Sequence, residues 1–231
     1  MMENQNRSYS YRVNWETVKA DWPLWILMGV FLIAGIIVYP HLPAQVPGHW
    51  NIHGEIDAYY PRWFGAFFEP ALAIAIYLLM LLTPLIDPRR QNYVRFADAY
   101  TFMRWVLVLF LSLLWVVTIM VSLGYPVDVT LIVKAAVAVL LIVIGNFMGQ
   151  FRHNYFVGIK TPWTLANEEV WHRTHRMAAR IWVLGGLLCL SMAFFQTSWA
   201  AYVYLGSIFA MVIIPTVHSY LLFAKISSQQ C

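Results

Sequence analysis

The sequence predicts an all-α polytopic membrane protein with six transmembrane helices. Hydrophobic residues make up 61% of the 231 residues and charged residues only 11%, and the mean hydropathy is +0.62. A soluble domain carries roughly 25% charged residues, so this chain has too few charges to cover a soluble surface. The composition also excludes a disordered chain, which needs low hydrophobicity and high net charge. The scattered basic residues form no stripe of the kind that binds nucleic acid.

The apolar stretches divide the chain into a short leading segment and one membrane domain. Residues 1–21 are expected to be a cytoplasmic amphipathic segment, because no small-residue cleavage site follows the first apolar stretch. Residues 22–231 form the membrane domain. A crossing helix needs about 20 apolar residues, and backbone in lipid must satisfy its own hydrogen bonds. The predicted spans are about 23–39, 67–86, 104–123, 127–147, 179–195 and 200–222, with a turn at 196–198 separating the last two.

The basic residues indicate the orientation of these spans. With the amino terminus inside, thirteen of the fifteen Lys and Arg residues fall on inner segments, Arg62 falls on an outer loop and Lys134 lies within the fourth span. The positive-inside rule therefore predicts that both termini are cytoplasmic. Two connections are long, an outer loop at about 41–66 and an inner loop at about 148–178. Function is expected to concentrate on them, or in a cavity between helices that they cover.

The outer loop gathers imidazole, amide and carboxylate side chains. Its candidate recognition residues are His49, Asn51, His53, Glu55 and Asp57, together with Glu69 at the mouth of the second span. His49, His53 and Glu55 are zinc-type ligands, but Gly48 and Gly54 disfavour the helix that would bring the two histidines together. We therefore expect no metal and no cofactor. The remaining interpretations are an interfacial lid with an aromatic belt and a docking surface for an extracellular peptide.

The inner loop is expected to contain the start of a helix. Pro162 suits a first helical turn with Thr161 as its cap, and Thr164 is a competing cap that would place Glu168 and Glu169 in the first turn. On either choice the helix begins near 162–165 and is expected to run into the fifth span.

No catalytic residues are predicted in the inner loop. It contains no nucleophile–base signature and no His-Glu-x-x-His motif. Its expected side-chain pairs are Glu168 with His172 and Trp171 with His175, each four residues apart on a helix. The simplest interpretation is an interfacial helix with Trp anchors and basic residues that face anionic lipid.

Lys134 is an intramembrane charge, about one third of the way down the fourth span. A charge within the membrane is a candidate functional residue, although a lysine this near the end of a span can extend its ammonium group outward. Asp128 and Glu69 are its candidate partners.

Two stretches of the chain resemble known families. Gly145-Asn146, the run from Asn154 to Leu165, Glu169-Val-Trp171 and Thr174-His175-Arg176 resemble the signature of the SdpI (sporulation-delaying-protein immunity) family. Residues 42–57 resemble the short domain of unknown function that often precedes it. Lys160 departs from the Arg that family members usually carry before Thr-Pro-Trp, and His53 lies outside the pattern.

The resemblance implies a multi-pass protein of the bacterial cytoplasmic membrane that protects against a secreted toxic peptide and signals to a cytoplasmic transcriptional repressor, without binding nucleic acid itself. It assigns recognition of the peptide to the outer loop and signalling to the repressor to an inner motif. The inner-motif residues are Asn146, Asn154, Gly158, Lys160, Thr161, Pro162, Trp163, Glu169, Trp171, Thr174 and His175. The alternatives are a transporter or flippase of a peptide or lipid, and a metal-dependent membrane hydrolase. The sequence indicates no oligomeric state.

Overall fold

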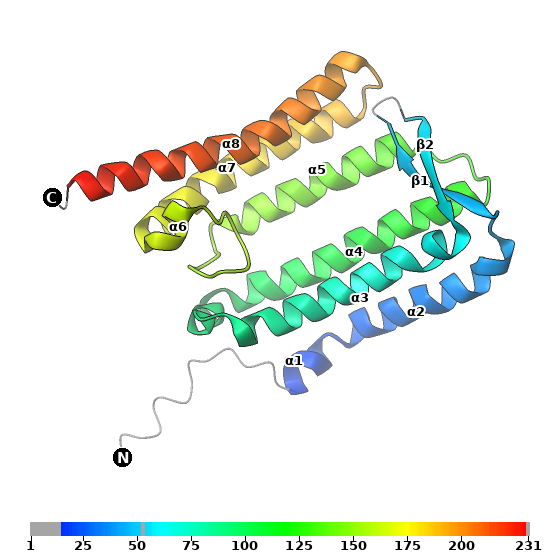
Figure 1. Ribbon diagram of the computed structural model, residues 1–231, viewed down its shortest axis with the longest axis horizontal. Helices are drawn as coiled ribbons and strands as arrows, with labels where there is room; N and C mark the ends of the chain where they lie inside the picture. The colour runs from blue at the N-terminus through cyan, green and yellow to red at the C-terminus, as the bar shows by residue number, and fades with distance from the viewer. Residues whose placement is uncertain (1–14, 52–53, 230–231) are drawn as a thin grey trace.

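Six long helices, capped at one end by a small β-hairpin, form the protein (Figure 1). The structure, a computed structural model, describes residues 15–51 and 54–229. Each long helix is long and apolar enough to cross a membrane, so the predicted six-helix membrane fold is confirmed. The helices are α2 (Trp22–Val38), α3 (Arg62–Ile86), α4 (Ala97–Ser122), α5 (Val129–Met148), α7 (Glu168–Ala193) and α8 (Ser198–Ser228).

Shorter elements connect these helices. Helix α1 (Trp15–Ala20) precedes α2, whereas residues 1–14 of the predicted amphipathic segment lie outside the described residues. The others are the 3₁₀ turns η1 (Tyr39–His41) and η2 (Arg90–Phe96), the strands β1 (Gln45–Trp50) and β2 (Ile56–Pro61), and helix α6 (Pro162–Ala166).

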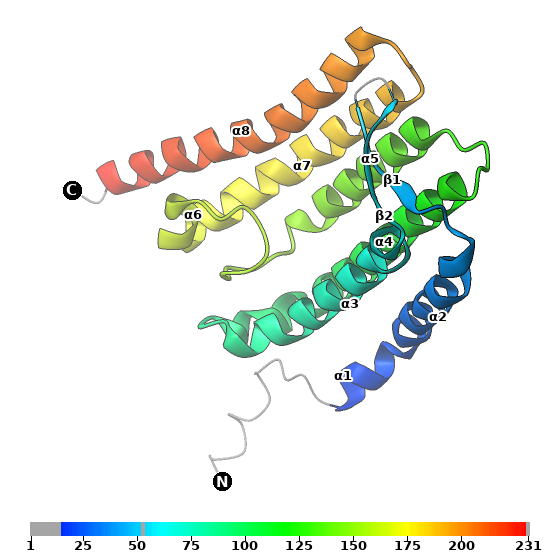
Figure 2. The same ribbon diagram turned by 45° about the vertical axis from the view of Figure 1, so that its right-hand side comes forward.

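The long helices lie in two groups of three. Figures 1 and 2 show α2, α3 and α4 side by side, and α5, α7 and α8 as a second group. Glycines let α5 and α7 approach closely, because a Cβ on Gly145 would lie 2.8 Å from the Cβ of Trp182 and one on Gly186 would lie 2.7 Å from Cγ1 of Ile142. A buried apolar cluster joins the groups near the inner loop, with Met80 and Met103 from the first and Met148 from the second.

The two ends of the helix bundle differ in what covers them. The β-hairpin lies at one end, called here the hairpin end, and α6 lies at the other, called the motif end (Figure 1). Helix α1 and the carboxyl end of α8 are both at the motif end, as an even number of crossings requires. That the motif end faces the cytoplasm stays a prediction.

The hairpin is an element that the sequence reasoning did not foresee. β1 and β2 pair antiparallel, with Val46 opposite Tyr60 and Trp50 opposite Ile56, and the register shifts around Gly48. The turn is closed by hydrogen bonds from the amide of Asn51 to the carbonyl of Glu55 (2.9 Å) and from the amide of Gly54 to the carbonyl of Asn51 (2.9 Å). Gly54 has φ +83°, a conformation that glycine adopts readily.

Several predicted helix boundaries need correction. Helix α3 begins at Arg62 rather than near 67, and α4 begins at 97 rather than 104. The predicted continuous helix from about 162 into the fifth span is wrong, because the extended backbone of Asn167 (φ −139°, ψ 125°) separates α6 from α7. Its side-chain oxygen accepts hydrogen bonds from the amides of Glu169 and Val170 and so caps α7. The predicted division near 196–198 is confirmed, with Thr197 preceding α8.

Candidate functional site

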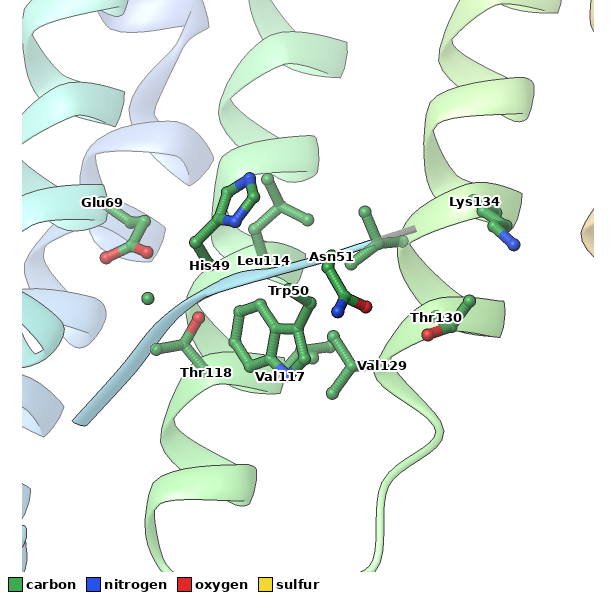
Figure 3. A pocket seen from close by; sticks show the side chains of 12 residues that line it. His49, Trp50, Asn51, Glu69, Leu114, Val117, Thr118, Val129, Thr130 and Lys134 are labelled. Carbon is green, nitrogen blue, oxygen red and sulfur yellow. The ribbon is translucent and has the colours of Figure 1, made fainter. Parts of the chain in front are cut away.

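A pocket of about 380 Å³ lies beneath β1, between α3, α4 and α5. Figure 3 shows Glu69 at one side and Lys134 at the opposite side, with β1 running between them. The pocket therefore brings together residues predicted from the outer loop, the second span and the fourth span. Its lining residues are Gly48, His49, Trp50, Asn51, Glu69, Leu114, Val117, Thr118, Val129, Thr130, Val133 and Lys134.

Glu69, which lines this pocket, carries an unsatisfied acceptor. Its Oε2 atom is buried and has no hydrogen-bond partner among the described residues. A buried polar atom without a partner is costly, and a carboxylate oxygen more so. Most buried polar groups in proteins are hydrogen-bonded, so this oxygen needs an explanation.

Lys134 forms no ion pair with either predicted partner in the described structure. Asp128 instead caps α5 by accepting a hydrogen bond from the amide of Leu131 (3.0 Å), and its other oxygen accepts one from Gln196 (2.8 Å). The partnership of Lys134 with Asp128 or Glu69 therefore stays a prediction. Figure 3 shows the ammonium of Lys134 on the side away from Glu69.

A second pocket of about 360 Å³ adjoins the first at the hairpin end. Thr130 and Lys134 line both pockets, and Gly54 of the hairpin turn contributes to the second. The remaining lining residues are Asp128, Gln196, Thr197, Ser198 and Ala201. A mostly apolar chamber is thus continued by a polar one.

The predicted recognition residues of the outer loop engage one another on the hairpin. Nδ1 of His49 lies 2.5 Å from Oδ1 of Asp57 on the opposite strand. Nδ2 of Asn51 donates to Oε2 of Glu55 (2.9 Å), and Oδ1 of Asn51 accepts from the amide of Glu55 (3.1 Å). His53 lies outside the described residues. Among the described residues, no three His, Cys, Asp or Glu side chains are grouped as a metal site would need.

At the motif end, Asn154 organises the inner segment, defined here as residues 149–161. Its Nδ2 donates to the carbonyls of Arg152 (2.8 Å) and Val157 (2.9 Å). Its Oδ1 accepts from the amides of Phe156 (2.8 Å) and Val157 (2.7 Å). The side chain is fully buried. Its four hydrogen bonds hold a tight turn that the backbone alone does not stabilise.

His175 and Trp171 fix the next part of this segment. Nε2 of His175 accepts a hydrogen bond from the amide of Ile159 (2.9 Å), so Nδ1 carries the proton and donates it to the carbonyl of Trp171 (2.8 Å). The two rings stack at 4.1 Å, as the predicted i,i+4 pair requires. Gly158 lies against them with φ +116°, and a Cβ there would be 2.4 Å from Nε2 of His175.

Thr161 joins the inner segment to α6 and α8. Its side chain and that of Thr164 form a reciprocal capping box at the start of α6, so the two candidate caps act together. Oγ1 of Thr161 also lies 3.0 Å from Oγ of Ser219 on α8. Oγ1 of Thr164 donates to the carbonyl of Ile159 (2.8 Å).

A polar cluster that the sequence reasoning missed ties the inner segment to the α3–α4 connection. Oδ2 of the buried Asp87 accepts a hydrogen bond from the amide of Tyr155 (3.0 Å). The guanidinium of Arg89 contacts the ring of His153 and donates to the carbonyl of Leu165 (3.2 Å). Burial lowers the pKa of His153, and the neighbouring positive charge of Arg89 lowers it further.

A second missed cluster lies on the first group of helices. Asp21 and Arg104 are both buried, and Nη2 of Arg104 donates to Oδ2 of Asp21 at 2.6 Å. The hydroxyl of Tyr77 donates to the same oxygen (3.1 Å), and the indole of Trp105 donates to Oδ1 (2.9 Å). Asp21 lies 83 residues from Arg104, so no local signal in the sequence relates them.

The inner-motif residues divide between the interior and the surface. The buried members are Asn154, Thr161, Trp171, Thr174 and His175. All of them except Thr174 make side-chain hydrogen bonds that hold the segment together, whereas Oγ1 of Thr174 has no hydrogen-bond partner among the described residues. The exposed members are Asn146, Lys160, Pro162 and Glu169, while Gly158 and Trp163 are partly buried. The predicted pair of Glu168 and His172 is present at 3.4 Å, and Glu169 pairs with Arg173 at 2.6 Å.

Comparison with known proteins identifies two family segments. Residues 150–219 match the SdpI/YfhL protein family, and residues 26–74 match a domain of unknown function, DUF1648. The chain is also 25% identical to Immunity protein SdpI of Bacillus subtilis (strain 168) over 205 residues, which cover 89% of this chain and 96% of that protein. No solved structure matches the chain. These matches confirm the resemblance predicted from the two loops, and the SdpI/YfhL match follows the DUF1648 match along the chain.

Proposed function

We propose that this protein is an immunity protein of the bacterial cytoplasmic membrane that binds a secreted toxic peptide at the hairpin end. The observation that carries the proposal is the similarity to Immunity protein SdpI over 89% of the chain. The matched residues include both the hairpin and the inner segment. A binding function without turnover follows from this relationship.

The pocket beneath β1 supports this assignment. It lies under the exposed hairpin and has mainly apolar walls with a few polar groups, which is typical of a ligand site. With the positive-inside orientation, the hairpin end is extracellular. A peptide that approaches the membrane from outside would reach the hairpin first.

The motif end supports a signalling role toward a cytoplasmic repressor. A partner protein would contact the side chains exposed there, and Lys160 and Glu169 are the exposed charged members of the inner motif. Asn154, Thr161, Trp171 and His175 would act by keeping the segment in shape through their hydrogen bonds. Substituting an exposed member should therefore reduce signalling and leave protection intact, whereas Asn154→Ala should reduce both.

A protection assay tests the immunity function. The wild-type chain and a variant with His49, Asn51 and Asp57 all changed to Ala are expressed in a toxin-sensitive bacterium, and the sporulation-delaying peptide is titrated. We expect protection by the wild type, and loss of protection by the variant at an equal amount of protein in the membrane. Glu168→Ala, on the exposed surface of α7 at the motif end, is the matched control and should protect fully.

Two results would contradict the proposal. A wild-type chain that is verified in the membrane and gives no protection would exclude immunity to this peptide. Full protection by the triple variant would exclude the hairpin as the recognition surface.

A further inference from the structure

We propose that Glu69 anchors a lysine side chain of the bound peptide, and that the pocket beneath β1 receives the apolar stem of that lysine. The inference deepens the proposed function and rests on it for the assignment of a peptide as the ligand. It begins from the buried Oε2 atom of Glu69, which has no hydrogen-bond partner among the described residues.

The surroundings of Glu69 leave a place for a cation. The ion pairs of the described residues do not include Glu69, and Lys134 lies at the opposite side of the pocket (Figure 3). His49, which also lines the pocket, is engaged by Asp57 on the hairpin. A carboxylate in an apolar site within the membrane is stabilised by pairing with a cation.

The shape of the site favours lysine among cations. The walls between Glu69 and Lys134 include Leu114, Val117 and Val129. A lysine buries its four-carbon stem against apolar walls and presents a compact ammonium group.

The adjoining polar pocket supports a peptide as the source of the lysine. A peptide carries backbone amides and carbonyls that need partners next to the apolar stem. The second pocket supplies such partners from Gln196, Thr197 and Ser198, and it shares Thr130 and Lys134 with the first. The peptide backbone would lie in this polar chamber while its lysine enters the apolar one.

A pair of peptides tests the inference directly. The full-length protein is placed in phosphatidylcholine nanodiscs, whose lipid headgroup carries no primary ammonium group. The probes are a short, fluorescently labelled apolar peptide with a single internal lysine and the same peptide with norleucine, which keeps the stem and lacks the ammonium. We expect wild-type protein to bind the lysine peptide about tenfold more tightly, as a partly buried charge-assisted hydrogen bond predicts.

Glu69→Gln identifies the group responsible. This variant keeps the shape of the side chain and should bind both peptides with equal affinity. Asp98→Asn removes an exposed carboxylate from the first turn of α4, at the motif end, and should keep the full preference for lysine. Equal binding of the two peptides by the wild type, which requires no variant to fold, would overturn the proposal. A lysine preference that persists in Glu69→Gln would overturn it as well.

The failure of this inference is distinguishable from failure of the immunity function. If Glu69→Gln protects cells fully while the triple hairpin variant does not, immunity stands and the lysine site is wrong. If the lysine preference depends on Glu69 but the wild-type chain protects no cells, the site stands and the immunity function is wrong.

Discussion

Replacing Asp21 by Asn should destabilise the protein strongly, because it leaves the buried Arg104 without its counter-charge. Arg104 is 0% exposed and Asp21 is 1% exposed, so water cannot substitute for the lost carboxylate. Two further guanidinium nitrogens of Arg104, Nε and Nη1, already have no hydrogen-bond partner among the described residues. The substitution therefore removes the counter-charge of a guanidinium group that has few other hydrogen-bond partners.

The size of the effect follows from these contacts. Breaking one side of a buried ion pair costs about 3–5 kcal/mol. Asn retains an oxygen that can accept from Tyr77 or Trp105, so we expect a loss near the lower end, about 3 kcal/mol. For a chain of this size, 1 kcal/mol corresponds to roughly 2–4 °C in Tm, which gives a decrease of about 10 °C.

Thermal unfolding in detergent micelles, followed by circular dichroism, measures this decrease. Arg104→Met should cost less than Asp21→Asn, because Tyr77 and Trp105 still donate to the carboxylate. The double variant should recover much of the loss, since neither buried charge remains. Asp98→Asn, the exposed-carboxylate control, should unfold within about 1 °C of the wild type.

A Tm of Asp21→Asn within about 2 °C of the wild type would refute the reasoning. So would a double variant whose loss equals the sum of the two single losses, because the two charges would then not interact in the folded protein.

Three further substitutions probe the motif end. Gly158→Ala should lower Tm by several degrees, because φ is +116° and the new Cβ would lie 2.4 Å from the His175 ring; an unchanged Tm would contradict this. Asn154→Ala removes four hydrogen bonds to the backbone and should cost about 2–4 kcal/mol, with faster proteolytic cleavage within residues 149–161 as the readout. The pKa of His153 is lowered in the folded protein, so as the pH falls below about 6.5 this residue binds a proton in the unfolded chain before it does so in the folded chain. Stability should therefore decrease from pH 7 to pH 5.5, and less steeply in His153→Gln; parallel pH profiles would exclude this group as the cause.

The membrane fold was predictable because it depends on composition over long windows. Six apolar stretches give six helices, since lipid leaves the backbone no other way to pair its polar groups. Helix ends depend on single residues instead. Asn167 interrupts the predicted continuous helix because its side chain caps α7. The sequence offered Thr161 and Thr164 as competing caps and did not indicate that they form one capping box.

The hairpin had a signal that could have been used. Two six-residue strands flank a short turn that contains Gly54, which is a known hairpin pattern. Pro47 and Gly48 obscured it, because both residues weaken a strand assignment. In the structure they coincide with the shift in register, where the ring of Tyr60 lies over Gly48.

The candidate site was foreseen in part. The sequence indicates His49, Asn51 and Glu69 as polar residues of one loop and its border, and in the structure they line one pocket with Lys134. The sequence did not indicate that Asp128 caps α5 and accepts a hydrogen bond from Gln196. The clusters around Asp21 and Asp87 could not be inferred, because each joins residues separated by more than sixty positions in the chain.

The burial of Asn154, Trp171 and His175 means that the residues that determine the shape of the inner segment are different from the residues that would contact a ligand. These side chains satisfy backbone groups of the inner segment, so their identities are dictated by how that segment is built. The pocket beneath β1 lies at the opposite end of the bundle and shares no residue with them. Homologous chains can therefore keep the same motif while they change which peptide they resist, with the hairpin and its pocket as the variable part.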